Sequence, residues 1–291
     1  MISLQGKVVF ITGGARGIGA EVARRLRNKG AKLVLTDLDK AELDALAAEL
    51  GEDRVLTAVA DVRDLPALQA VADQAVEHFG GIDVVVANAG IASYGSVLQV
   101  DPEAFKRVLD VNLLGVFYTV RATLPALIDR RGYLLIVSSL AAFAASPGMA
   151  SYDMTKAGNE HLANALRFEV GHTGVNVGVA HMSWIDTALV RDTEADLPSF
   201  GRLLAALPWP LNKTTSVTRC AEAFVKGIED RKDRVYCPRW VILFRWLKPV
   251  LSTRVGEFPV RKAAAELPQL DAEVAVLGRS TSAYNQRLEK S

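Results

Sequence analysis

This 291-residue chain contains few cysteines and almost no net charge. Its two cysteines, Cys220 and Cys237, have no metal-ligand spacing and form no disulfide framework, so we expect a reduced, cytoplasmic setting. Lysine and arginine number 34 against 33 aspartates and glutamates, which leaves no bulk charge to attract nucleic acid. No apolar run reaches the roughly 18 residues of a spanning helix, and a strand pattern starts almost at the N-terminus. We therefore expect neither a membrane span nor a signal peptide.

What the chain has is an alternation of short, apolar, β-branched runs with longer amphipathic stretches. We predict strands at Lys7–Thr12, Lys32–Thr36, Val55–Ala60, Ile82–Ala87, Tyr133–Val137 and Val175–Ala180, with a short edge strand at Arg234–Cys237. Helices are predicted at Ala41–Leu50, Leu65–Phe79, Asp101 to about Asp129, Ser151–His172 and Val217–Glu229. Strands that are apolar along their whole length are typical of a parallel sheet covered on both faces. The pattern predicts an α/β fold with a doubly wound sheet between two helical layers.

The final part of the chain has a different composition. We predict a catalytic domain over residues 1–237, including an excursion at residues 187–215, and a helical C-terminal extension over residues 238–291 that packs on it. This extension mixes aromatic residues with cations, as at Trp240, Arg245 and Trp246. It could cover a pocket mouth or pad a subunit interface. It could also be an interfacial helix that touches a membrane peripherally, although Pro249 argues against that.

Three glycines, Gly13, Gly17 and Gly19, lie where the first strand meets a helix. Glycine permits positive φ and a close approach of the backbone to a pyrophosphate. The helix N-terminus adds free N–H groups and the positive end of its dipole. The spacing G-x-x-x-G-x-G differs from the commonest fingerprint, so a glycine-rich turn without a ligand stays open as the alternative.

Polar residues follow the next strands at the same predicted edge of the sheet. Asp37, after the second strand, could accept both adenosine ribose hydroxyls and repel a 2′-phosphate, or it could cap a helix. Asp61 could contact adenine or cap a turn. Asn88-Ala89-Gly90 could be an ordinary turn, but it lies where ligands bind in open α/β sheets.

A serine, a tyrosine and a lysine follow the fifth strand, at Ser139, Tyr152 and Lys156. Residues four apart on a helix are neighbours, and a lysine cation favours ionisation of a phenol whose pKa is otherwise about 10. Ser139 and Tyr152 could both donate hydrogen bonds to a substrate oxygen. The alternatives are an exposed helix pair and a turn serine. Asn112, a polar residue inside an apolar helix, is equally explained by a kink or a satisfied core hydrogen bond.

Together these residues resemble the short-chain dehydrogenase/reductase family over roughly residues 5–235. The matching motifs are Thr12-Gly13-x-x-x-Gly17-x-Gly19, Asp61, Asn88-Ala89-Gly90, Asn112, Ser139, Tyr152 and Lys156. The resemblance implies a Rossmann-type domain with about seven strands and an oxidoreductase acting on alcohols and ketones with NAD(P). It also implies a homodimer or homotetramer built through the helices near residues 101–129 and 150–173. A non-redox nucleotide-binding regulatory or scaffold protein, or a lyase or epimerase on the same fold, is the alternative.

The resemblance also implies roles for individual residues. Tyr152 is expected to be the general acid/base, Lys156 to hold the nicotinamide ribose and lower the tyrosine pKa, and Ser139 to position the substrate oxygen. Asn112 is expected to help hold a relay water. We expect NAD rather than NADP, because we weigh the Asp37 carboxylate above Arg16, a residue type that precedes the second glycine in many NADP-using members. Cofactor contacts are expected from Gly13, Arg16, Gly17, Ile18, Gly19, Asp37, Asp61, Val62, Asn88, Ala89, Gly90, Tyr152, Lys156, Ile185 and Thr187.

On the substrate side the chain departs from the family. Met182-Ser183 stands where the family has Pro-Gly, which leaves the shape of the nicotinamide-side loop open, whereas Thr187 falls in place. The segments that contact substrate in the family are mostly apolar here, so we predict a small lipophilic alcohol or ketone, with ordinary packing as the alternative. Substrate contacts are expected from Ser139, Leu140, Met149, Tyr152 and Trp184, with Phe143, Met182, Leu189, Leu203, Leu204, Leu207 and Trp209 nearby. The four histidines share no metal-ligand spacing, so we predict surface or packing roles and no metal site.

Overall fold

Seven parallel strands form one sheet in the order β3-β2-β1-β4-β5-β6-β9 in the computed structural model, which describes residues 1–251 and 253–290. The strands are β1 (Val8–Thr12), β2 (Lys32–Asp37), β3 (Val55–Val59), β4 (Val84–Ala87), β5 (Tyr133–Val137), β6 (Asn176–Met182) and β9 (Arg234–Cys237). The seven predicted strands are confirmed, including the edge strand, with small shifts at their ends. The order reverses between β1 and β4, which is where ligands bind in such sheets.

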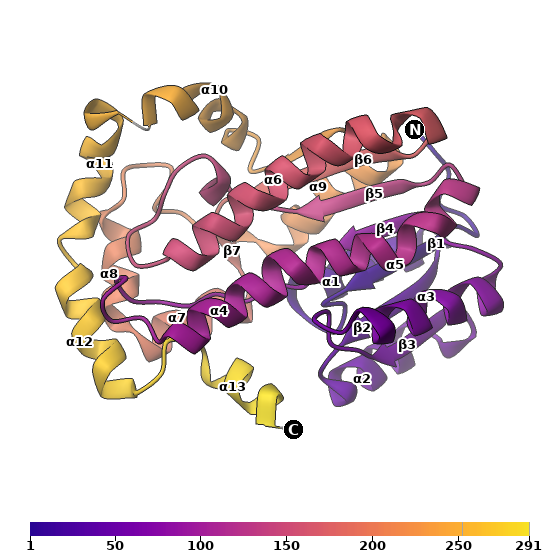
Figure 1. Ribbon diagram of the computed structural model, residues 1–291, viewed down its shortest axis with the longest axis horizontal. Coiled ribbons are helices and arrows are strands. Elements are labelled where there is room, and N and C mark those ends of the chain that lie inside the picture. Colours follow the sequence, from indigo (N-terminus) through magenta and orange to yellow (C-terminus); the bar gives the residue numbers. More distant parts are fainter. Residues whose placement is uncertain (252, 291) are drawn as a thin grey trace.

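Helices cover both faces of the sheet because its strands are apolar on both sides (Figure 1). Side chains alternate along a strand, so Val9 and Ile11 of β1 join one core cluster while Val8 and Phe10 join the other. The first cluster is covered by α1 (Gly17–Asn28), α2 (Lys40–Leu50) and α9 (Val217–Glu229). The second is covered by α3 (Leu65–Phe79), α5 (Gly115–Asp129) and α6 (Ala150–Val170). The predicted three-layer α/β fold is confirmed.

The predicted helix from Asp101 to Asp129 is interrupted in its middle. Asp101 caps α4 (Pro102–Leu109) by accepting from the N–H groups of Glu103 and Ala104, both at 3.2 Å. A π-helical turn at Asp110–Leu114 then leads into α5. The stretch Pro102–Asp129 is long and apolar enough to cross a membrane, but half of its most apolar window is buried inside the protein, as in a core helix.

Several segments after β6, among them α7 (Ala188–Asp196), α8 (Pro198–Ala206), α10 (Val241–Leu251), α11 (Arg254–Ala264) and α12 (Leu267–Leu277), gather on one side of the molecule, whereas α9 and β9 belong to the central layers (Figure 1). Two short strands, β7 (Ile185–Asp186) and β8 (Thr215–Ser216), pair beside α7 and α8. The tail consists of α10, α11, α12 and α13 (Ala283–Lys290). Leu270 and Val274 of α12 join Met149 and Phe200 in a buried cluster, and Arg279 pairs with Asp196 at 2.8 Å. The tail therefore packs directly on the excursion.

Candidate active site

A cavity of about 220 Å³ lies at the carboxyl ends of β1 and β4, where the strand order reverses. Asn88, just after β4, ties these two strands together. Its Nδ2 donates to the carbonyls of Thr12 at 3.0 Å and Gly13 at 2.9 Å, and its backbone N–H donates to Thr12 Oγ1 at 3.1 Å. The amide of Asn88 thus fixes the glycine loop against the neighbouring strand.

The glycine loop fits a dinucleotide pyrophosphate. Gly13 has φ +62°, and a Cβ there would lie 2.8 Å from Cα of Ala89. Gly17, at φ +58°, starts α1, and a Cβ at Gly19 would overlap the Gly13 carbonyl. The first turn of α1 contains no acidic residue, and no side chain caps it. Its N–H groups and positive dipole end therefore remain available to an anion.

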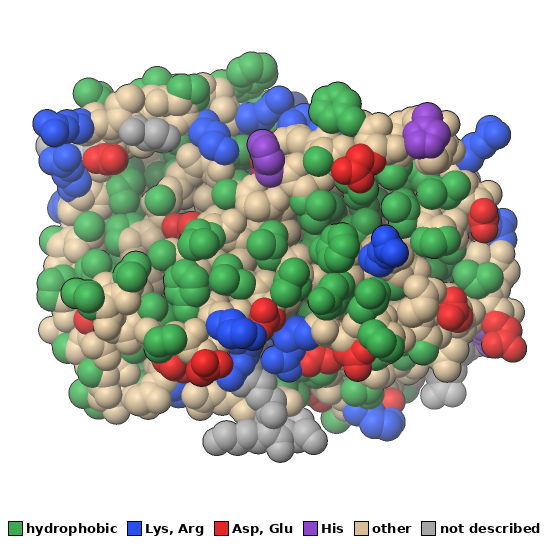
Figure 2. Space-filling model, viewed as in Figure 1, with side chains coloured by type: hydrophobic (Ala, Val, Ile, Leu, Met, Phe, Trp, Pro, Cys, Tyr) green, Lys and Arg blue, Asp and Glu red, His purple; other side chains and the backbone are tan. Residues whose placement is uncertain are grey.

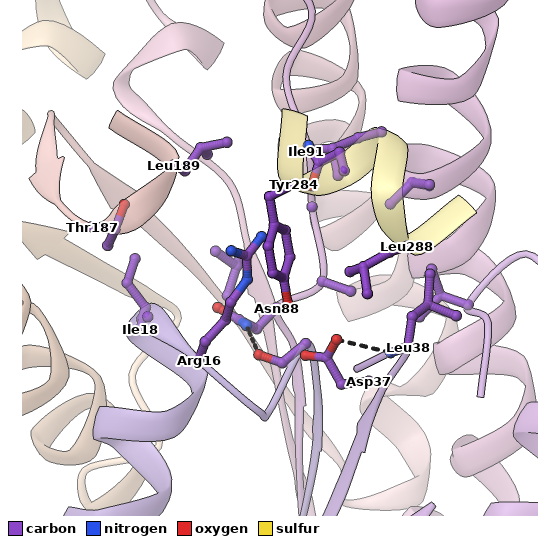
Figure 3. Close-up of a pocket in the computed structure, with 18 of the residues that line it drawn as sticks. Arg16, Ile18, Asp37, Leu38, Asn88, Ile91, Thr187, Leu189, Tyr284 and Leu288 are labelled. Carbon is purple, nitrogen blue, oxygen red and sulfur yellow. Dashed lines mark hydrogen bonds between the residues drawn. The ribbon is translucent and has the colours of Figure 1, made fainter. Parts of the chain in front are cut away.

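Asp37 lies at the end of β2 and lines this cavity (Figure 3). Its Oδ1 accepts from the N–H of Leu38 at 2.8 Å, and its Oδ2 accepts from the N–H of Ala15 at 3.2 Å. The helix-capping alternative is wrong, because Asp39 caps α2 by accepting from the N–H of Glu42 at 3.2 Å. The Asp37 carboxylate is instead held on the rim of the cavity.

Asp61 also lines the cavity, paired with Arg63. The Arg63 Nη2 lies 2.5 Å from Asp61 Oδ2, and the Arg63 N–H donates to Asp61 Oδ1 at 2.8 Å. Burial opposes ionisation of Asp61, but Arg63 outweighs it and lowers the pKa of the carboxyl. Asp61 therefore presents a fixed anion to the cavity and also caps a local turn, while its contact with adenine stays a prediction.

Tyr152 lies on the wall between this cavity and a second one of about 130 Å³. Lys156 lines only the first cavity and Ser139 only the second, so three of the four predicted catalytic side chains meet where the cavities adjoin, and Asn112 lies apart from them. Ser139 follows β5, whereas Tyr152 and Lys156 lie one helical turn apart near the start of α6. Ser138 holds this helix to the strand, because its Oγ donates to the Lys156 carbonyl at 2.7 Å.

Burial controls the electrostatics of this group. It raises the pKa of Tyr152 to about 12, with partial compensation from a hydrogen bond with Ser139. It also lowers the pKa of Lys156 to about 8. Lys156 Nζ donates to the Val137 carbonyl at 3.0 Å and lies 5.3 Å from the centre of the Tyr152 ring. Desolvation therefore sets the direction of the tyrosine pKa shift in the chain alone, and the expected lowering by Lys156 stays a prediction.

Asn112 lines neither cavity. Its Oδ1 accepts from the N–H of Ile91, and its Nδ2 donates to the Ile91 carbonyl, both at 2.8 Å. Nδ2 also reaches Thr155 Oγ1 at 3.2 Å. Both open alternatives for Asn112 are present: a satisfied core hydrogen bond and a distorted helix, here a π-helical turn. The side chain fixes the backbone after β4 and does not line either cavity, and the expected part of Asn112 in holding a relay water stays a prediction.

Most predicted cofactor contacts line the larger cavity: Gly13, Arg16, Gly17, Ile18, Asp37, Asp61, Val62, Asn88, Ala89, Gly90, Tyr152, Lys156 and Thr187. Gly19 does not, because it packs against the Gly13 carbonyl inside α1. Ile185 does not either, since it lines the smaller cavity. Gly19 therefore supports the glycine loop without facing the cavity, and Ile185 lies on the side of the smaller cavity.

The smaller cavity is lined mainly by apolar side chains. The predicted substrate residues Ser139, Leu140, Met149, Tyr152 and Trp184 line it, as do Met182, Leu189, Leu203 and Leu207. Three other expected residues do not. Phe143 and Leu204 are buried elsewhere in the core, and Trp209 is 79% exposed. Sequence reasoning did not name Leu211, which lies in the excursion, or Val260, which reaches the cavity from α11.

Sequence reasoning also missed the environment of His181. This side chain is fully buried against Phe143, with ring centres 4.5 Å apart. Its Nε2 lies 2.8 Å from Glu160 Oε2, and its Nδ1 lies 3.2 Å from the Ser139 carbonyl. Burial opposes ionisation of Glu160, but His181, Arg234 and Lys248 outweigh it and lower the pKa of this carboxyl. His181 is thus a packing residue that also supports the backbone of Ser139.

The larger cavity is also lined by Tyr284, Asn285 and Leu288 of α13, which no motif singled out.

Within residues 1–251 and 253–290, no three His, Cys, Asp or Glu side chains are grouped so as to hold a metal ion.

Comparison with known proteins gives a consistent set of relatives. The sequence pattern of the short chain dehydrogenase family matches residues 7–198. The chain is 35% identical over 217 residues to an uncharacterized NAD-dependent oxidoreductase of Mycobacterium tuberculosis, covering 69% of this chain and 78% of the relative. It is 31% identical over 255 residues to 11-beta-hydroxysteroid dehydrogenase 1A of Arabidopsis thaliana, covering 84% and 72% respectively. An uncharacterized oxidoreductase of Staphylococcus saprophyticus is 32% identical over 198 residues, covering 67% and 85%.

Proposed function

The chain belongs to the short-chain dehydrogenase/reductase family and is an oxidoreductase that uses NAD(P), and from that premise we propose that it interconverts a hydrophobic secondary alcohol and its ketone. The position of Tyr152 carries the proposal. This tyrosine lies on the wall shared by a glycine-lined cavity suited to a dinucleotide and an apolar cavity suited to a lipophilic substrate. A proton donor at that junction can reach an oxygen atom bonded to the carbon that exchanges hydride.

Tyr152, Ser139 and Lys156 have different roles in the proposed proton transfer. When bound, the nicotinamide supplies the hydride chemistry. With a pKa of about 12, the Tyr152 phenol is protonated near neutral pH and can give its proton to a ketone oxygen. Ser139 stabilises the charge that develops on that oxygen by hydrogen bonding. In the oxidation direction the phenol must first lose its proton, so the positive ring of oxidised cofactor and Lys156 must together offset the cost of burial.

The lipophilic substrate class follows from the lining of the smaller cavity. Leucine, methionine, valine and tryptophan side chains surround Tyr152 on that side, so a polar substrate would lose hydration without gaining partners. The relative from Arabidopsis thaliana is named for a hydroxysteroid, which is a lipophilic secondary alcohol. Both observations support a substrate with a hydrophobic skeleton.

NAD is the proposed cofactor. The fixed carboxylate of Asp37 can accept ribose hydroxyls, whereas it would repel a 2′-phosphate. The Mycobacterium tuberculosis relative is named NAD-dependent, which supports the same choice. Arg16, the residue that favours NADP in the resemblance, stacks against the Tyr284 ring at 3.2 Å.

A substrate screen tests the proposed function. The purified chain is incubated with NAD or NADP and a panel of lipophilic secondary alcohols and small polyols, and the reduced-nicotinamide absorbance is followed. Turnover of lipophilic alcohols with NAD is expected. Faster turnover of polyols than of every lipophilic alcohol would contradict the substrate class, and a preference for NADP would contradict the role of Asp37.

We also propose that the protein forms a homodimer or homotetramer. Figure 2 shows hydrophobic side chains gathered along α5 and α6, and four large ones on these helices and the π-helical turn before α5 are exposed: Leu114, Phe117, Met154 and Phe168. An apolar face of this kind favours a protein partner. Light scattering during gel filtration should give a multiple of the 31.4 kDa chain mass, and Phe117→Glu should reduce it. A monomer at micromolar concentration would contradict the proposal.

A further inference from the structure

The C-terminal helix α13 lies over the dinucleotide cavity, far in sequence from every motif of the family. Figure 3 shows the side chains of Tyr284 and Leu288 projecting from this helix toward Arg16, Asp37 and Leu38. The family pattern matches residues 7–198, so α13 lies outside the conserved pattern that defines the site.

Tyr284 joins the tail to the adenosine end of the cavity. Its hydroxyl donates to Asp39 Oδ2 at 2.7 Å, and the Arg16 guanidinium lies 3.2 Å from the centre of its ring. Tyr284 thus bonds Asp39, while the N–H groups of Leu38 and Ala15 hold the neighbouring Asp37 carboxylate at the cavity. Stacking on an aromatic face restrains a guanidinium while leaving its N–H edge available to an acceptor.

Asn285 carries an unused donor at the same place. The side chain is 6% exposed and lines the cavity, yet its Nδ2 is buried with no hydrogen-bond partner among the described residues. A buried amide donor without an acceptor is costly and uncommon. A dinucleotide offers phosphate, hydroxyl and ring acceptors that could satisfy it.

The geometry favours a wall of the binding site over a plug. A cavity of about 220 Å³ remains with α13 in place, lined jointly by this helix and the glycine loop. A segment that merely blocked the site would be expected to satisfy its own buried polar groups there.

We propose that α13 is part of the cofactor site, with Tyr284 orienting Arg16 and Asn285 Nδ2 donating a hydrogen bond to the bound dinucleotide. This inference rests on the proposed function, because it presumes that the cavity holds NAD(H). It assigns to the tail a direct role in cofactor affinity that is independent of the catalytic tyrosine.

Binding measurements on the full-length chain test the inference without any turnover. NADH titrations, followed by nucleotide fluorescence, compare the parent chain with Asn285→Asp, Tyr284→Ala and the control Gln286→Ala, which alters the same helix outside the cavity. Replacing the donor by a carboxylate, or removing the ring, should weaken NADH binding by about tenfold, the equivalent of one hydrogen bond to a charged group. Gln286→Ala should stay within about twofold, and thermal unfolding should show that all four proteins are folded.

The outcomes separate the two proposals. If the parent binds NADH and both cavity variants bind it equally well, the role of α13 is refuted while the proposed function stands. Tighter binding by the variants would show that α13 obstructs the site, which also refutes it. A parent chain that binds no NADH overturns the proposed function and this inference together.

A second, independent observation concerns the outer face of α10. Leu243, Trp246, Leu247 and Val250 recur at the spacing of one helix face, and they are 56%, 70%, 46% and 49% exposed. Pro249 does not end this helix, which continues to Leu251. A contiguous apolar stripe on a solvent-facing helix is typical of an interaction surface.

The charges around the stripe indicate which kind of surface it would bind. Residues 238–256 contain no aspartate or glutamate, whereas the cations are Arg239, Arg245 and Arg254, together with Lys248, whose Nζ lies 5.9 Å from the centre of the buried Phe143 ring. A helix with an apolar face and flanking cations suits a membrane surface that contains anionic lipids.

The inner side of α10 connects this face to the apolar cavity. Phe244 packs in a cluster with Leu140 and Leu211, which also line that cavity. We propose that α10 docks on an anionic lipid surface and so places the substrate cavity next to the phase in which a lipophilic substrate dissolves.

Vesicle flotation tests the docking. The chain should float with phosphatidylcholine vesicles that contain phosphatidylserine and bind weakly to phosphatidylcholine alone. The triple variant Leu243→Ser/Trp246→Ser/Leu247→Ser should lose flotation, whereas Phe168→Ser, an exposed aromatic change on α6, should retain it. No flotation of the parent, or a triple variant whose only defect is a smaller oligomer, would overturn the proposal.

Discussion

Removing the hydroxyl of Tyr152 is the sharpest perturbation of the proposed chemistry. Tyr152→Phe deletes one oxygen atom from the wall between the two cavities and leaves the ring packing in place. Because burial holds the tyrosine pKa at about 12, the parent phenol is a proton donor throughout the neutral range. General acid catalysis contributes about 10²–10⁴ in rate, so kcat for reduction of a lipophilic ketone should fall by about that factor. NADH affinity should stay within about twofold, because the hydride carrier is held by other groups.

Tyr94→Phe is a matched control in the same apolar cavity. Tyr94 is also buried and does not line the dinucleotide cavity, and its hydroxyl lies within hydrogen-bond distance of Thr193 Oγ1, at 2.8 Å. The single proton of the Thr193 hydroxyl can donate to the Leu189 carbonyl at 2.7 Å, so Thr193 keeps a partner in this variant. We expect Tyr94→Phe to keep kcat within about tenfold, the effect of one lost neutral hydrogen bond. A Tyr152→Phe enzyme within tenfold of the parent, or equal losses in the two variants, would refute the assigned role.

Three further changes have defined outcomes. Asp37→Asn removes a carboxylate that would repel the 2′-phosphate of NADP by about 1–4 kcal/mol at contact. The ratio of NADP affinity to NAD affinity, measured by titration, should therefore rise about tenfold. An unchanged ratio would contradict the role of Asp37. Gly19→Ala places a methyl group on the Gly13 carbonyl, so both Tm and NADH affinity should fall, and a fully active, equally stable variant would be unexpected. Burial raises the pKa of Asp153 from 3.8 to about 7, so the folded state binds an extra proton between these values and stability falls as pH rises through that window. Asp153→Asn should be more stable than the parent above pH 7, by at most about 4 kcal/mol, and chemical denaturation should show the gain shrinking toward pH 4.

The strands and the motifs at their carboxyl ends were predictable because their signals are local. An unbroken β-branched run predicts a buried parallel strand wherever it occurs, and its end fixes the positions of Gly13, Asp37 and Asn88 at one edge of the sheet. Ser139 and Tyr152 were predictable in the same way, from a spacing that one strand and one helix preserve.

Other parts of the site depend on contacts between distant segments. Asn112 stood out as a polar residue in an apolar helix, but only the folded chain shows that its amide is used by Ile91. The pKa of Tyr152 depends on how completely the excursion and tail exclude water, which no spacing encodes. Tyr284 reaches Asp39 across more than 240 positions of sequence, so no pattern near either residue could indicate their contact.

Transfer of deuterium from labelled NADH tests the central claim most directly. The chain is incubated with NADH deuterated at the transferable position and with a panel of lipophilic ketones, and the products are analysed by mass spectrometry. We predict an alcohol that carries deuterium on its carbinol carbon, formed by the parent and lost with Tyr152→Phe. A parent chain that binds NADH yet transfers no deuterium to any ketone, or a Tyr152→Phe chain that transfers it equally fast, would contradict the claim.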